Sequence, residues 1–144
     1  MPFHVMDTEE WRAFLREPVR PAVLATTRAD GRPHAAPIWY DLDDDGTIMF
    51  TTGAGTVKGR NICRTGQVAL VVQDDRAPFS FVIIQGEATW SEDMDQLRAW
   101  ATRLGGRYMG PDRAEAYGAR NAVPGELLIR VRPTSVVAEA DIAD

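Results

Sequence analysis

The first apolar positions of the chain repeat at helical spacing. Trp11, Phe14 and Leu15 lie at i, i+3 and i+4, which puts them on one face of a short helix. Asp7 and Glu10 have the three-residue spacing of a capping box, so the helix is expected to begin there. Two prolines follow shortly and end it.

Five apolar runs rich in strand-forming residues come next. They cover residues 22–27, 34–42, 47–52, 67–73 and 79–90. Short turn signals separate the first three runs, which predicts an antiparallel meander. The last two runs are apolar at successive positions, so both of their faces are expected to be buried, one inside a barrel and one against something outside it.

Helical spacing returns after Ser91. The apolar positions are Met94, Leu97, Trp100, Ala101 and Leu104, and Gly105–Gly106 is expected to stop the helix. A short polar helix over 113–120 and closing strands over 126–132 and 136–138 complete the pattern. The order of elements predicts one mainly β domain over residues 1–144, a β-barrel of six to seven antiparallel strands with peripheral helices.

Composition narrows the range of functions. The chain has 144 residues, a net charge of −5 and a single cysteine, Cys63, which is expected to be a small buried hydrophobe. The acidic balance argues against a general nucleic-acid surface. No stretch is long and apolar enough to span a membrane, and the first residues lack a signal-peptide pattern. With one cysteine no intrachain disulfide can form, which suits the cytoplasm.

The basic residues are almost all of one kind. Of 16, 15 are arginine, and the one lysine is Lys58. An ammonium is a compact point charge, whereas a guanidinium is a planar fork. Chance explains a single lysine, but so does a site that requires an ammonium.

Lys58 lies in the most informative segment, residues 50–61 (FTTGAGTVKGRN). Two threonines end a strand, a glycine-bearing loop follows, and a helix is expected over 57–65 with Thr56 as its N-cap. Hydroxyls, cations and a helix start suit a phosphate, although the spacing is not that of a P-loop. An ordinary strand–loop–helix connection remains equally open.

Two further features carry candidate chemistry. Pro37, Ile38 and Trp39 lie in a strand segment of which one face could bracket a planar ring, but local chemistry alone favours a Trp39 that fills the core or a dimer interface. The loop that ends in Pro78 and Phe79 could reach a neighbouring subunit's ligand, or it is simply a turn.

Together these motifs resemble one family. The runs GRPHAAPIWY at residues 31–40, FTT at 50–52 and VKGRN at 57–61 are similar to the pyridoxamine-phosphate-oxidase-like superfamily, and within it to the F420-dependent oxidoreductases of the B class. The resemblance implies an FMN-binding-type split β-barrel and a homodimer with two cofactor sites at the subunit interface. Unlike a true pyridoxamine phosphate oxidase, the chain is short and ends in AEADIAD, so that activity is not expected.

The resemblance also assigns residues and cofactors. Its phosphate-binding residues fall on Thr51, Thr52, Lys58, Arg60 and Asn61, its ring-lining strand on Pro37, Ile38 and Trp39, and its partner-subunit contribution on Pro78 and Phe79. Arg64, one helical turn past Arg60, is expected to help bind the acidic tail of coenzyme F420.

The implied function is hydride transfer between coenzyme F420 and a small unsaturated or quinone-like substrate, with the cofactor carrying the chemistry. Two alternatives stay open: an FMN-dependent oxidoreductase on the same fold, and a non-enzymatic flavin-, deazaflavin- or haem-binding protein. No metal cluster or catalytic triad is visible in the sequence, so the catalytic residues are unknown. Tyr40 or a bound water could supply a proton.

Overall fold

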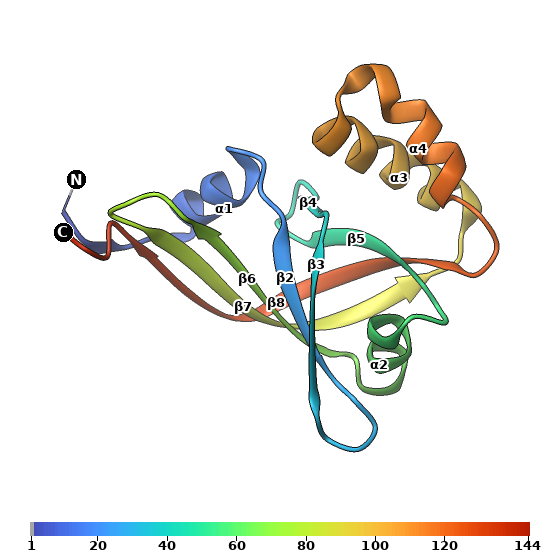
Figure 1. The fold of residues 1–144 in the computed structure, drawn as a ribbon, viewed down its shortest axis with the longest axis horizontal. Helices are drawn as coiled ribbons and strands as arrows, with labels where there is room; N and C mark the ends of the chain where they lie inside the picture. The colour runs from blue at the N-terminus through green and yellow to red at the C-terminus, as the bar shows by residue number, and fades with distance from the viewer. Residues whose placement is uncertain (1) are drawn as a thin grey trace.

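The computed structural model describes residues 2–144, which form one antiparallel sheet curled into a split β-barrel with helices around it (Figure 1). The elements are β1 (His4–Val5), α1 (Thr8–Arg16), β2 (Ala22–Thr27), β3 (Pro33–Ile38), β4 (Asp41–Leu42), β5 (Ile48–Gly53), α2 (Val57–Thr65), β6 (Gln67–Asp74), β7 (Ser80–Ser91), α3 (Met94–Met109), the 3₁₀ turn η1 (Pro111–Arg113), α4 (Ala114–Asn121) and β8 (Glu126–Ala140). The strands run in the order β3-β2-β6-β7-β8-β5-β4, and β1 pairs with β8. The predicted mainly β barrel with peripheral helices is confirmed.

Two helices begin where the sequence predicted. The Asp7 carboxylate accepts from the Glu10 backbone N–H at 2.8 Å, and the Glu10 carboxylate accepts from the Asp7 N–H, so the capping box at the start of α1 is complete. Thr56 caps α2 by accepting from the Gly59 N–H at 3.0 Å. α2 ends at Gly66, whose φ of 67° suits a residue without a Cβ.

The predicted three-strand meander is wrong. The single strand expected over 34–42 is two strands, because the chain leaves the β2 edge after Ile38 and β4 pairs with β5 instead. β5 in turn pairs with β8, so β3 is an edge of the sheet. Local turn signals cannot show this, because the partner of β5 lies about 80 residues along the chain.

The prediction that Gly105–Gly106 stops the third helix is also wrong, since α3 continues to Met109. These glycines serve a close helix crossing: a Cβ on Gly105 would lie 2.4 Å from the Cβ of Tyr117, and one on Gly118 2.0 Å from the Thr102 hydroxyl. α3 and α4 therefore form a tightly packed hairpin at one end of the barrel (Figure 1).

The two closing strands are one long strand, β8, which pairs with β5, β7 and β1. The barrel interior is filled by alternate residues of the strands, among them Leu24, Leu70, Ile84 and Ile129. Cys63 does not join this core as expected but is exposed, because α2 turns Gly59 and Ile62 toward the barrel. No helix within residues 2–144 is long and apolar enough to cross a bilayer.

Candidate functional site

One cleft brings together five of the predicted cofactor residues, which are Pro37, Ile38, Trp39, Thr51 and Lys58. It lies between the end of β3, the middle of β5, the start of α2 and the α3–α4 hairpin, and its volume is about 330 Å³. Its lining is Pro21, Pro37, Ile38, Trp39, Thr51, Lys58, Ala101, Leu104, Gly105, Asn121 and Glu126. The proposed ring strand and the proposed phosphate residues thus line one cleft although they lie 12 to 21 positions apart in sequence.

The wall of the cleft formed by Pro37, Ile38 and Trp39, called the ring-side wall, packs against the α3–α4 hairpin. The Trp39 ring stacks on Tyr108 of α3, with centroids 5.0 Å apart and planes within 2°, and Tyr117 of α4 packs against it at a tilt. The Tyr108 hydroxyl donates to the Arg20 carbonyl at 2.7 Å and accepts from the Tyr40 N–H at 3.2 Å. Trp39 is therefore fixed at the point where the chain leaves β3.

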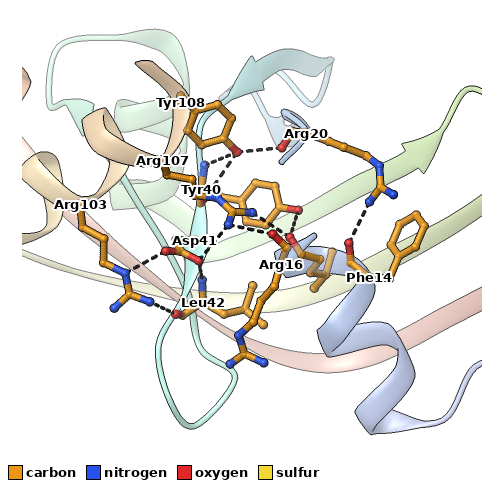
Figure 2. Close-up of polar contacts among 10 residues, drawn as sticks. Phe14, Arg16, Arg20, Tyr40, Asp41, Leu42, Arg103, Arg107 and Tyr108 are labelled. Atoms are coloured by element: carbon orange, nitrogen blue, oxygen red, sulfur yellow. Dashed lines mark hydrogen bonds and ion pairs between the residues drawn. The ribbon is translucent and has the colours of Figure 1, made fainter. Parts of the chain in front are cut away.

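A partly buried cluster of Asp41, Arg103 and Arg107 joins this hairpin to the barrel (Figure 2). The Asp41 carboxylate accepts from Arg103 at 2.8 Å and lies 3.6 Å from Arg107. Arg107 also donates to the carbonyls of Leu15 and Arg16, both at 2.9 Å, where α1 ends. These contacts connect α3 to β4 and to the end of α1.

Tyr40 does not face the cleft. Its side chain is fully buried and its hydroxyl donates to the Leu15 carbonyl at 2.7 Å. Burial raises the pKa of this phenol above its ordinary value, mainly because the interior disfavours the phenolate. The suggestion that Tyr40 supplies a proton to substrate therefore has no support in this geometry.

The phosphate side of the cleft holds one cation and one acid. Lys58 and Thr51 face it, and so does Glu126 from the start of β8. Desolvation raises the pKa of the Glu126 carboxyl, while the Thr51 hydroxyl and the Lys58 charge act in the opposite direction. No local signal marks Glu126 as a site residue, because the Pro124–Gly125 turn before it indicates only that a strand begins.

The remaining predicted phosphate residues lie elsewhere. The Thr52 hydroxyl is turned away from the cleft and pairs with the Thr56 hydroxyl at 3.1 Å. Asn61 is buried and donates to the Thr26 hydroxyl at 3.0 Å. Both residues hold the loop and α2 in position.

Arg60 and Arg64 line a second groove, on the other side of α2. Its volume is about 400 Å³, and the tip of the β2–β3 hairpin adds Arg28 and Arg32. Arg64 is anchored to the Thr27 carbonyl and to the Asn61 amide oxygen, and Arg32 pairs with Asp30. Four arginines around one groove make a strongly basic surface in an acidic chain, and two of them were not anticipated.

Pro78 and Phe79 are far from the cleft of their own chain. They lie at the tip of the β6–β7 hairpin, where their carbonyls accept from Ala143 and Ile142 near the C-terminus. In Figure 1 this tip and α2 occupy opposite ends of the barrel.

Comparisons with known proteins agree with this architecture. An F420H(2)-dependent biliverdin reductase of Mycobacterium tuberculosis is 31% identical over 125 residues, which cover 85% of this chain and 82% of that protein. The solved structure of a conserved hypothetical protein from the same species has a TM-score of 0.82 at 25% identity, covering 93% of this chain and 84% of that one. A structure described as an F420 reductase has a TM-score of 0.68 at 28% identity, covering 87% and 94%.

The sequence match to a known family covers nearly the whole described chain. Residues 7–138 match the family described as pyridoxamine 5'-phosphate oxidase, a span that runs from the N-cap of α1 almost to the end of β8. The resemblance drawn from the motifs at residues 31–40, 50–52 and 57–61 is confirmed. The chain belongs to the pyridoxamine 5'-phosphate oxidase family of split β-barrels, on the branch whose relatives include F420-dependent reductases.

Proposed function

We propose that this protein is an F420-dependent oxidoreductase that transfers a hydride between the deazaflavin and a small unsaturated or quinone-like substrate. The observation that carries the proposal is the convergence of Pro37, Ile38 and Trp39 with Thr51 and Lys58 on one cleft. The relatives named for F420-dependent reduction support the choice of cofactor.

The residues present fit such a cofactor. The cleft's volume of about 330 Å³ lies within the range of small-molecule sites, and its walls combine apolar side chains with a few polar groups. We assign the ring to the wall of Pro37, Ile38 and Trp39, and the phosphate to Thr51 and Lys58. When bound, the reduced deazaflavin supplies the hydride.

We further propose that the basic groove takes the acidic tail of coenzyme F420. Beyond its phosphate, F420 continues into a lactyl and oligoglutamate tail, whereas FMN ends at the phosphate. Arg60 and Arg64 lie on the helix that begins beside Lys58, and Arg28 faces them from the β2–β3 hairpin. Guanidinium groups bind carboxylates in a bidentate manner, so the groove suits glutamates.

The working unit is proposed to be a homodimer. Val23, Val71, Ile83 and Val137 are aligned across four strands on the outer face of the sheet. Val23 is 47% exposed and Val137 49%. Such an apolar row is costly in water and suits a second copy. In that dimer Pro78 and Phe79 of the partner subunit would complete the cleft that their own chain does not reach.

The test of cofactor choice is a pair of titrations, with F420 and with FMN, at low and moderate salt. F420 should bind more tightly, and its advantage should shrink as salt screens the exposed arginines. Arg60→Ala and Arg64→Ala should each weaken the binding of F420 but leave the binding of FMN unchanged. Tighter binding of FMN than of F420 to the unmutated protein would overturn the assignment in favour of a flavin enzyme.

The test of the activity uses reduced F420 with a panel of unsaturated and quinone-like acceptors. An acceptor that takes the hydride and a proton should regenerate the absorbance of the oxidised deazaflavin at a rate that depends on protein concentration. If F420 binds tightly and none of these acceptors is reduced, the result favours the alternative of a non-enzymatic cofactor-binding protein over the proposed reductase.

A further inference from the structure

The cleft contains a carboxyl group that the phosphate assignment does not explain. Glu126 lines the same cleft as Thr51 and Lys58, and both of these residues lower the pKa of its carboxyl against the larger effect of burial. No ion pair joins Lys58 to Glu126 or to any other acid within residues 2–144. The cation and the acid therefore face one volume without neutralising each other directly.

We propose that Glu126 selects a singly charged phosphodiester over a doubly charged phosphomonoester in this cleft. The inference rests on the proposed function, because it assumes that the cofactor phosphate lies at Thr51 and Lys58. The phosphate of F420 is esterified on both sides and carries one negative charge, whereas the terminal phosphate of FMN carries about 1.5 to 2 at neutral pH.

Among the residues that the structure describes, only two with charged side chains line the cleft. Lys58 contributes the positive charge and Glu126 the negative one, and the other lining residues from β3, α3 and α4 are uncharged. Lys58 offsets the single charge of a phosphodiester, so the Glu126 carboxylate faces little net negative charge when such a ligand is bound. A phosphomonoester leaves an excess negative charge in a partly desolvated site, which is unfavourable.

Burial of Glu126 makes its carboxyl easier to protonate. The carboxyl is partly desolvated at the start of β8, and its pKa is already raised, mainly by burial. A phosphate placed nearby raises the pKa further, because the carboxylate is then next to a like charge. Cofactor binding should therefore take up a proton, and affinity should fall as pH rises through the titration of Glu126.

The variant that isolates this effect is Glu126→Gln, which keeps the shape and hydrogen bonding of the side chain and removes its charge. Repulsion scales with the charge on the ligand, so FMN should gain about tenfold in affinity and F420 about threefold. The ratio of the two affinities should therefore narrow by a factor of about three. Glu92→Gln, an exposed carboxyl before α3, is the matched control and should change neither affinity.

A pH series gives a second readout. Titrations of both ligands between pH 5.5 and 8 should show affinity falling with pH more steeply in the unmutated protein than in Glu126→Gln. The ligands ionise alike in both proteins, so the difference between the two profiles belongs to Glu126. A residue with only a structural role would shift both profiles without changing their slopes.

The outcomes separate this inference from the proposed function. If both ligands bind, Lys58→Ala weakens both, and Glu126→Gln changes them by the same factor, the selection by Glu126 is wrong and the cofactor assignment stands. If neither ligand binds the folded wild-type protein, or Lys58→Ala has no effect on either, the phosphate assignment is wrong and the inference is wrong with it. A narrowed ratio of the two affinities, together with a pH profile that is less steep in Glu126→Gln than in the unmutated protein, supports the selection by Glu126.

Discussion

Trp39 and Tyr108 stack face to face, with planes within 2° and centroids 5.0 Å apart. Trp39 directly follows the ring-side strand β3, and Tyr108 is the last residue but one of α3. The Tyr108 hydroxyl also reaches the backbone at Arg20 and Tyr40. One side chain thus connects the cleft wall, the segment after α1 and the helical hairpin.

Two variants separate the ring of Tyr108 from its hydroxyl. Tyr108→Phe should cost about 1 kcal/mol of unfolding free energy through the lost hydrogen bonds and leave cofactor affinity unchanged. Tyr108→Leu should cost about 1 kcal/mol more, because the stack is lost, and should weaken cofactor binding as Trp39 becomes mobile. Urea unfolding and cofactor titration measure the two effects. Equal cofactor affinity in the two variants would show that the stack does not position Trp39.

Arg107 should contribute more to the free energy of unfolding than Arg103, which lies one turn earlier on α3. Arg107→Met removes a nearly buried guanidinium from Asp41 and from the last carbonyls of α1, which should cost about 3 kcal/mol. Arg103→Met also breaks a contact with Asp41, but Arg103 is 46% exposed, so the cost should be about 1 kcal/mol. Urea unfolding compares them directly, and equal losses would refute the buried role of Arg107.

The loop before α2 offers a matched pair of glycines. A Cβ on Gly59 would lie 2.2 Å from the Gly53 carbonyl oxygen, whereas a Cβ on Gly55 would meet nothing within 4 Å. Gly59→Ala should therefore destabilise the protein by about 1–3 kcal/mol and weaken cofactor binding by moving Lys58. Gly55→Ala should leave stability unchanged or slightly improved. Thermal unfolding that ranks them in the opposite order would contradict the close packing of α2 on the loop.

The outer apolar row predicts the oligomeric state. The protein should be a dimer in light scattering at micromolar concentration, and Val23→Asp should convert it to a monomer by burying an unpaired charge in the interface. Val123→Asp changes a valine of similar exposure away from this row and should leave the dimer intact. A stable monomer in the unmutated protein would remove the interface that Pro78 and Phe79 are proposed to reach.

Local signals predicted the local structure well. The capping box at Asp7, the N-cap at Thr56 and the limits of β2 and α2 depend on neighbouring residues, and all are confirmed. The pairing of β5 with β8 depends on contacts between distant segments, and no turn signal encodes it. Gly105–Gly106 has the composition of a helix end, but its role depends on α4, which the α3 sequence does not reveal.

The sequence motifs predicted only part of the candidate site. Thr51 and Lys58 line one cleft with Pro37, Ile38 and Trp39, and the cofactor roles that the resemblance implies for them stay a prediction. Strand alternation turns Thr52 to the other face, and helical periodicity carries Arg60 and Arg64 into a separate groove. Glu126 lines the cleft and Arg28 lines the basic groove. Neither could be predicted from local signals, because each lies on a segment remote in sequence from Lys58.

The central claim is that Lys58 binds the phosphate of a deazaflavin cofactor in this cleft. Its most direct test is the affinity of Lys58→Ala for F420, measured beside Arg132→Ala, which removes an equal charge from an exposed ion pair on the sheet. Lys58→Ala should bind F420 about ten- to a hundredfold more weakly, because a charge-assisted contact is lost, while its thermal stability stays unchanged. Arg132→Ala should bind like the unmutated protein. Wild-type affinity for F420 in Lys58→Ala would contradict the account.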